Sequence, residues 1–456
     1  MAGRILLDLD PLRDSRDFRL LFTGQLIAEL GAMLAMVAIP FQVYALTRSS
    51  LQVGAVSLAQ LGPLILGALA GGTVGDALGR RPVLVAALGG LAVTSGGLAA
   101  TAGLAHPPVA AIYLVSAVAA GLGGVLSTIC TAAVPSLVAA RHLIPAYATM
   151  QVVDQVGMVA GPALAGLLIG VVPLPWVYAL VAATYLAAAL IMWRLSPGPP
   201  PATAAGRPGL GSIVEGLRYL RGRQALQGAY LIDINAMVFG MPKALFPALA
   251  AAVFHGGPST LGYLYAAPAA GALLGALTTG WLDRARRPGW AVIVAVCVWG
   301  GAITAFGFAR VLWLALALLA VAGWADVISA VLRATILQSS VPDELRGRMS
   351  GLQIAVVEGG PRLGDLEAGT VASLVSAEFS IVSGGLACIA GAALLTALLP
   401  GFRHYRQPAQ SGQPAQAGQP AQTSQPGPAS PEAPRRGPDV AGESTVPPGP
   451  CPGGTG

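Results

Sequence analysis

Residues 71–82 read GGTVGDALGRRP and place one acid and two arginines between two long apolar runs. The flanking runs, 51–75 and 82–104, are each long enough to cross a hydrocarbon core of about 30 Å as a helix. The charged stretch is therefore interpreted as a short turn between two membrane-spanning helices, and it indicates how the rest of the chain is built.

Apolar runs of this length recur along the chain. The 456 residues are 55% hydrophobic and only 10% charged, whereas a soluble domain has about 25% charged residues. The runs are too long for barrel strands, which have about ten residues of alternating polarity. We expect an all-α membrane protein with twelve transmembrane helices, over 20–46, 51–75, 82–104, 108–137, 145–171, 174–193, 225–254, 258–282, 289–309, 311–339, 348–376 and 379–399.

The distribution of arginine predicts the orientation of these helices. Arginine is concentrated in the N-terminal segment and in every second loop, whereas the other loops carry only Arg48 and Arg310. Loops rich in positive residues stay on the cytoplasmic side of a membrane. We therefore expect both termini to be cytoplasmic, and we assign the net charge of +6 to topology, with no nucleic acid as partner.

Changes in composition divide the chain into segments. A linker over 194–224, rich in glycine and proline at its start, separates six spans in an N-terminal half (20–193) from six in a C-terminal half (225–399). We expect residues 1–19 to form a cytoplasmic amphipathic segment. Residues 400–456 are predicted to be a disordered cytoplasmic tail. Residues 407–456 contain repeated QPAQ units and no aromatic residue, a composition that cannot bury enough surface to fold.

The two halves resemble each other in sequence. The turn GGTVGDALGRRP (71–82) matches GWLDRARRPG (280–289), and GMVAGPALAG (157–166) matches VEGGPRLGDL (357–366). We therefore expect two pseudo-symmetric six-helix halves. Tandem halves of this kind are typical of a transporter whose site lies between them.

Two motifs resemble signatures of the major facilitator superfamily. The loop after the second span has the superfamily's spacing, with Ala77 where an arginine is usual, at Gly72, Asp76, Gly79, Arg80 and Arg81. The fifth span is similar to the signature of exporters that exchange substrate for protons, with Ala165 where a glycine is usual, at Gly157, Gly161, Pro162 and Gly166. The resemblance implies the major facilitator fold and favours export.

A closer resemblance extends to about residue 406, to the bacterial enterobactin exporters and their relatives. The stretches that carry it are YALTRSSLQVG (44–54), LGYLYAAPAAGALLGALTTGWL (261–282), TILQSSVPDELRGRMSGL (335–352) and FRHYRQP (402–408). It implies a protein of the bacterial cytoplasmic membrane that moves a catecholate siderophore or similar amphiphile outward.

Each signature has a physical interpretation and an alternative. Asp76 and Arg80 are four residues apart and can face each other across the turn, and the resemblance implies that Asp76 latches one transport state. The alternative is that the arginines only anchor the loop on the cytoplasmic side. Gly157 and Gly161 share a helix face that another helix can approach closely, and Pro162 can bend the helix, although ordinary small-residue packing would have the same pattern.

Charges recur in the eleventh span, where residues 358–369 read EGGPRLGDLEAG. At about 100° per residue, Glu358, Arg362 and Asp365 fall on one face, where alternating charges can neutralise each other. Two interpretations remain open: a static ion-pair cluster that fixes helix packing, or a group that handles substrate or protons.

Other intramembrane charges are further candidates for the transport site. A proton-coupled carrier needs a buried carboxylate that binds and releases a proton near neutral pH. The best candidates are Glu29, Asp154 and Asp233. In the tenth span Asp326 and Arg333 share a face, and the arginines at 333 and 362 are suited to attract an anionic substrate.

Together these features predict a proton-coupled secondary exporter of a small amphiphilic, siderophore-like molecule, acting as a monomer in the lipid bilayer by alternating access. The alternative is a broad-specificity drug efflux pump of the same superfamily. The chain has no Walker-type GxxxxGK[ST] motif, so we expect the proton motive force to be the energy source and no cofactor to be needed. We expect neither an enzyme nor a metal site, because histidines occur only at span ends or loops and the cysteines have no ligand spacing.

Overall fold

The computed structural model describes four stretches of the chain. In the fourth stretch, the beginning of the eleventh predicted span is described by its backbone only. The described residues are 10–196, 217–278, 287–341 and 343–405, with backbone alone at 140, 343–352, 354 and 355. Predictions for residues 1–9, for most of the linker, for the turn around 280–286 and for the tail from 406 onward lie outside them.

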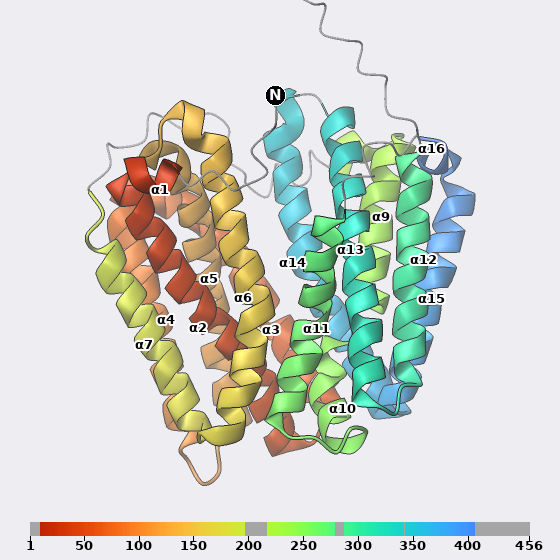
Figure 1. The fold of residues 1–456 in the computed structure, drawn as a ribbon, viewed down its shortest axis with the longest axis horizontal. Coiled ribbons are helices and arrows are strands. Elements are labelled where there is room, and N and C mark those ends of the chain that lie inside the picture. The colour runs from red at the N-terminus through yellow and green to blue at the C-terminus, as the bar shows by residue number, and fades with distance from the viewer. Residues whose placement is uncertain (1–9, 197–216, 279–286, 342, 406–456) are drawn as a thin grey trace, which may run out of the picture. The chain divides into compact units, whose positions relative to one another are not determined.

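Six long helices form the N-terminal half (Figure 1). They are α2 (Arg16–Thr47), α3 (Ser50–Leu78), α4 (Arg80–Ala102), α5 (Val109–Leu137), α6 (Leu143–Val171) and α7 (Leu174–Met192). Short elements flank them: α1 (Asp10–Asp14) and the 3-10 turn η1 (Ala140–His142). Each helix lies within a few residues of its predicted span.

The C-terminal half repeats this pattern with one interruption. Its elements are α9 (Gln224–Phe239), η2 (Lys243–Leu245), α10 (Phe246–Ala252), α11 (Pro258–Leu277), α12 (Pro288–Gly307), α13 (Leu312–Ser340), α14 (Asp343–Leu374), α15 (Ala377–Leu398) and α16 (Pro400–Arg403). The prediction of one continuous helix over 225–254 is wrong, because the chain leaves the helix after Phe239 and resumes it at Phe246. Gly240 and Pro242 lie in the interruption, and proline cannot supply the backbone donor that a helix interior needs.

The predicted all-α fold with two six-helix halves is confirmed. Among the described residues, eleven helices are long and apolar enough to cross a membrane, with the segment from α9 to α10 taken as one. The remaining long helix is α14, whose 32 residues carry the charges of the eleventh predicted span. Its charges, and not its length, separate it from the other spans.

The two halves meet through two equivalent pairs of helices. Helix α14 packs along α3, and α11 packs along α6. At the first crossing a side chain at Gly54 would collide with the backbone of Asp365, and at the second Gly262 lies against Gly166 at comparably close range. Only glycine permits backbones to approach this closely.

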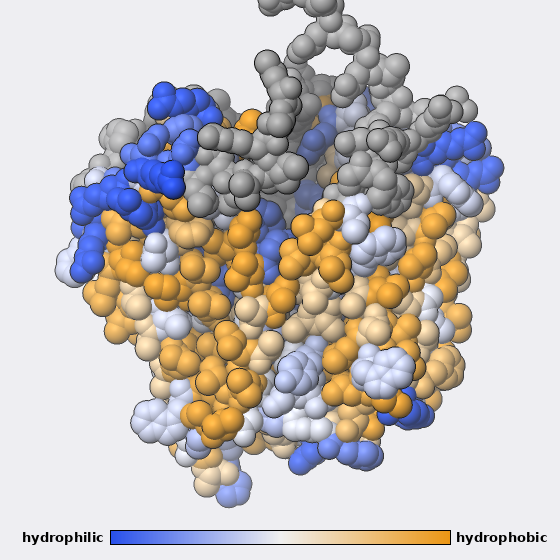
Figure 2. Space-filling view, viewed as in Figure 1, coloured by the Kyte–Doolittle hydropathy of each residue, from blue (hydrophilic) through white to orange (hydrophobic). Residues whose placement is uncertain are grey.

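Both crossings lie near the beginnings of α3 and α11, on the side of the protein opposite α1 and α16 (Figure 1). We call the side of α1 and α16 the terminal side. The halves are therefore closed against each other away from the terminal side. An apolar belt covers the middle of the molecule, while hydrophilic residues gather at its two ends and in a recess toward the terminal side (Figure 2).

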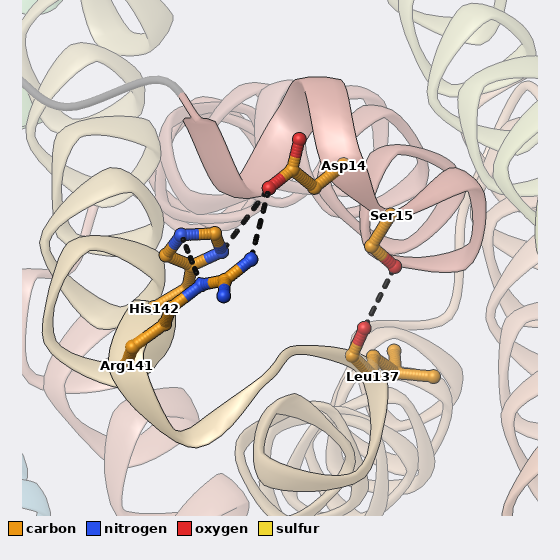
Figure 3. A network of polar contacts seen from close by, with 5 residues as sticks. All are labelled: Asp14, Ser15, Leu137, Arg141 and His142. Carbon is orange, nitrogen blue, oxygen red and sulfur yellow. Dashed lines mark hydrogen bonds and ion pairs between the residues drawn. The ribbon is translucent and has the colours of Figure 1, made fainter.

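Polar contacts hold the short helix α1 to the loop between α5 and α6 (Figure 3). The Ser15 hydroxyl donates to the Leu137 carbonyl at 2.7 Å and also caps α2. Asp14 lies 3.6 Å from His142 Nδ1 and 4.0 Å from Arg141 Nη2. The described part of the predicted cytoplasmic segment is thus tied to the N-terminal half, and the helix α2 begins already at Arg16.

The end of the C-terminal half differs from the prediction. Residues 400–405, which were expected to start the disordered tail, instead turn back onto the helices as α16. Phe402 is fully buried: its ring occupies the space left by the missing side chain of Gly228, and its backbone carbonyl lies against Gly289. Both close contacts require glycine at these positions, so the folded part extends at least to residue 405.

Candidate transport cavity

Three adjoining cavities lie between and within the halves, toward the terminal side. A cavity of about 400 Å³ is lined by the N-terminal half together with Glu358 of α14. One of about 190 Å³ is lined by both halves, and one of about 560 Å³ lies among α9, α13 and α14. We call these the N-half cavity, the bridging cavity and the C-half pocket. Met158 lines both the N-half cavity and the bridging cavity, and Asp326 lines both the bridging cavity and the C-half pocket, so neighbouring cavities share a wall.

The N-half cavity brings together two of the predicted carboxylates. Glu29 of α2 and Asp154 of α6 both line it, close enough for their charges to interact. Glu358 lines the same cavity from the other half. Carboxylates from both halves therefore face one space, and among the described residues that line it the only ones that carry charge are acids.

The signature of α6 explains how Glu29 is placed. Gly157 packs against the Glu29 side chain, and Gly161 packs against Met33 one turn further along α2. The predicted close approach of a helix to these glycines is confirmed, and that helix is α2. Gly166 instead packs against Gly262 of α11. The glycines of the α6 signature therefore contact both α2 and α11.

In the C-half pocket Arg333 forms a buried ion pair with Asp233 of α9. Only 9% of the Arg333 side chain and 5% of the Asp233 side chain are exposed. Arg333 Nε also donates to the Ser329 carbonyl at 3.3 Å. Asp326 and Arg333 lie on one face of α13, as predicted, and both line this pocket. Arg333, however, pairs with Asp233 of α9 and not with Asp326.

The charges of α14 separate between two sets of partners. Arg362 Nη1 lies 2.9 Å from Glu358 Oε2 and donates to the Glu358 carbonyl at 2.7 Å. Asp365 accepts a hydrogen bond of 3.0 Å from the Ala244 backbone and another from Ser57 of the other half. The predicted cluster is thus an ion pair plus a separate acid at the contact between the halves.

The interruption in the seventh span is held by side chains from three helices. Trp299 Nε1 donates to the Gly240 carbonyl at 2.9 Å, and the Tyr265 hydroxyl donates to the Lys243 carbonyl at 3.1 Å. The Ala244 N–H is the donor to Asp365. Unwound backbone persists at membrane depth only where such partners satisfy it. Because the chain is unwound here, Lys243 lines the bridging cavity opposite Asp326.

The loop signature is visible in the turn between α3 and α4. Gly79 has a φ of 86°, a left-handed conformation that favours glycine, and it ends one helix where the next begins. Arg80 donates to Ser136 of α5 at 2.8 Å. Asp76 forms no ion pair with any described residue, and Gly72 has almost open space around it. The predicted pairing of Asp76 with Arg80 is therefore not formed in this state.

These features, namely twelve helices in two halves with a polar cavity between them, define a membrane transporter of the major facilitator type. Solved structures share the fold. The nucleoside transporter NupG superposes with a TM-score of 0.64 at 14% identity, over 85% of this chain and 98% of that one. The peptide-transporter-family (POT) protein PepTSo gives 0.68 at 12% identity, over 85% and 98%.

Sequence comparison identifies the family within this fold. The profile described as "Transmembrane secretion effector" matches residues 8–421, and the chain belongs to that family of major facilitator transporters. The enterobactin exporter EntS of Escherichia coli K12 is 30% identical over 402 residues, 88% of this chain and 96% of that protein. EntS of Citrobacter koseri is 31% identical over 403 residues, with the same coverage. Family members are transporters, not enzymes.

Proposed function

We propose that this protein exports a small amphiphilic, siderophore-like molecule across the bacterial cytoplasmic membrane, in exchange for protons and by alternating access. The observation that carries the proposal is the identity of about 30% to enterobactin exporters along 96% of their length. The bridging cavity, which is lined by both halves, supports it, because a carrier of this fold binds its substrate between its halves.

The direction of loading follows from the orientation predicted by the arginines. If the terminal side is cytoplasmic, the described state is closed toward the outside, and its cavities reach toward the cytoplasm. This is the state in which an exporter takes up substrate from inside the cell. The latch predicted at Asp76 belongs to the opposite state, which agrees with its lack of an ion pair among the described residues.

Proton coupling is assigned to Glu29 and Asp154. Both acids line the N-half cavity, where no described lining residue is basic, so either can take a proton without breaking an ion pair. Asp233 is a weaker candidate because Arg333 neutralises it. No cofactor is required, since movement of the proton supplies the energy.

Uptake into inside-out membrane vesicles tests the proposal. The cytoplasmic face of these vesicles points outward, so export accumulates a radiolabelled catecholate siderophore inside them. We expect accumulation that needs an inside-acidic proton gradient and collapses with a protonophore. Equal accumulation with and without the gradient would contradict proton coupling. Accumulation of varied lipophilic drugs but of no siderophore would favour the broad-specificity efflux pump instead.

A further inference from the structure

The C-half pocket contains polar atoms that have no partner within the described protein. Asp326 Oδ1 and Gln353 Oε1 are both inaccessible to solvent and accept no hydrogen bond. Both residues line the pocket, from α13 and α14 respectively. A buried acceptor without a donor is unfavourable by about 1–3 kcal/mol. Each of these two oxygens is therefore a position where a ligand's donor would be stabilised.

The charges of the described residues in and beside the pocket nearly balance. The charges of Asp233 and Arg333 cancel within their ion pair. Lys243 lies within electrostatic reach of Asp326 and offsets its charge. A site with balanced charge and unpaired acceptors does not select an anion. It selects a ligand that brings hydrogen-bond donors and little net charge.

The size and walls of the pocket define the rest of the ligand. Its volume of about 560 Å³ falls in the range of sites for drug-sized molecules, about 300–1,000 Å³. The remaining walls are mostly apolar, and Ala330 and Ala334 leave room beside α13, with Met237 and Leu337 close by. Such walls suit an aromatic ring or a short alkyl chain.

We propose that the C-half pocket is a substrate subsite for uncharged, hydroxyl-rich amphiphiles such as phenols and catechols, with Asp326 and Gln353 accepting hydrogen bonds from the ligand's hydroxyl groups. This inference rests on the proposed export function. It adds that the hydroxyl groups of the substrate are recognised, and that Asp326 and Gln353 recognise them. The pocket lies wholly within one half, so it moves with that half when the two halves rock.

Binding to the full-length protein in lipid nanodiscs tests the subsite. The probes are an octyl amide of dihydroxybenzoic acid and its dimethyl ether, which lacks the two donors but keeps the ring and the chain. Calorimetry, corrected with empty nanodiscs, gives both affinities. We expect the wild type to prefer the dihydroxy probe by at least about tenfold, because each hydrogen bond contributes a factor of about 2 to 10.

The variant Gln353→Met keeps the side-chain volume and removes the acceptor. We expect it to reduce the preference for the dihydroxy probe about five- to tenfold. The matched control is Gln52→Met, because Gln52 lines none of the three cavities and its Oε1 accepts a hydrogen bond from the Tyr113 hydroxyl. This control should keep the preference of the wild type. Asp326→Ala, which removes the acceptor of α13, provides a second test in the same pocket if Gln353→Met does not fold.

Three outcomes would overturn the subsite: equal affinity of the wild type for both probes, no binding of either, or the same loss in the control as in Gln353→Met. The vesicle assay separates this inference from the proposed function. If siderophore transport is observed but the preference for the dihydroxy probe does not depend on Gln353 or Asp326, only the subsite is contradicted. Donor-dependent binding without transport supports the subsite and contradicts the export function.

Discussion

At the scale of single residues, the two arginines with described side chains inside the predicted spans, Arg333 and Arg362, are both held in ion pairs. Arg333 binds Asp233, and Arg362 binds Glu358. Pairing of this kind lowers the free energy of placing a charge inside a membrane. The sequence predicts that both arginines attract an anionic substrate; this stays a prediction for Arg362, whereas Asp233 cancels the charge of Arg333 in the C-half pocket. Their ion pairs indicate that structural stabilisation is at least part of what they do.

The ion pair of Asp233 and Arg333 gives a prediction about stability. Removing one partner of a buried pair leaves the other charge unpaired, which lowers the free energy of unfolding by about 3–5 kcal/mol. We expect Asp233→Asn and Arg333→Gln each to lower the melting temperature strongly in detergent. The double variant should recover most of the loss, because no unpaired charge is left.

The exposed pair of Arg310 and Glu378 is the control for this prediction. Its side chains are 67% and 36% exposed, and a surface pair contributes about 0–1 kcal/mol. Glu378→Gln should therefore change the melting temperature little. A double variant of the buried pair that is no more stable than either single variant would contradict the account of Arg333 and Asp233.

How much of this could be predicted from the sequence depends on the distance between partners along the chain. Helical periodicity correctly placed Asp326, Ser329 and Arg333 on one face, because those residues lie within two turns. It could not reveal that Arg333 pairs with Asp233, one hundred residues earlier, since that contact depends on the packing of α9 against α13.

At the scale of elements, the interrupted seventh span is the feature that the sequence analysis missed. Hydropathy remains high across residues 225–254, so the segment satisfies the criteria for one helix. Gly240 and Pro242 were the available signal. They were not decisive because glycine and proline also occur inside unbroken helices of this chain, for instance Pro63 of α3.

Asp365 provides the test of this element, because its carboxylate accepts from the Ala244 backbone in the interruption. Asp365→Ala leaves that N–H without its acceptor, whereas Asp365→Asn keeps an oxygen in place. We expect amide hydrogen exchange at Ala244 to be faster in Asp365→Ala than in Asp365→Asn, by about fivefold for a hydrogen bond of about 1 kcal/mol. Equal exchange in the two variants would show that Asp365 does not hold the interruption together.

At the scale of the whole molecule, the two halves are related by more than their repeated motifs. The pairs α3 with α14 and α6 with α11 make equivalent crossings, both near the side opposite the terminal side. The sequence predicted the halves and their matching glycines. It could not predict which side is closed, because both states of an alternating carrier use the same residues.

The crossing at Gly54 predicts how the conformational equilibrium can be shifted. A side chain there collides with the backbone of Asp365, so Gly54→Leu should disfavour the state described here. Distances between spin labels on the two halves, measured by double electron–electron resonance on the side opposite the terminal side, should lengthen. Gly62→Leu is the control, because this glycine of the same helix has open space around it. Equal distance distributions in both variants would contradict the assignment of this crossing as the closed contact.

Export of the substrate is proposed to be coupled to protons through the N-half cavity. Substrate-triggered proton flux in liposomes containing the purified protein measures this most directly, with Glu29→Gln, Asp154→Asn and the control Asp14→Asn, whose carboxylate lies outside the cavities. We expect proton flux upon addition of a catecholate siderophore, and we expect this flux to be lost in at least one cavity variant and kept in the control. Folded protein that gives no flux with any compound, or flux that neither cavity variant changes, would contradict this coupling.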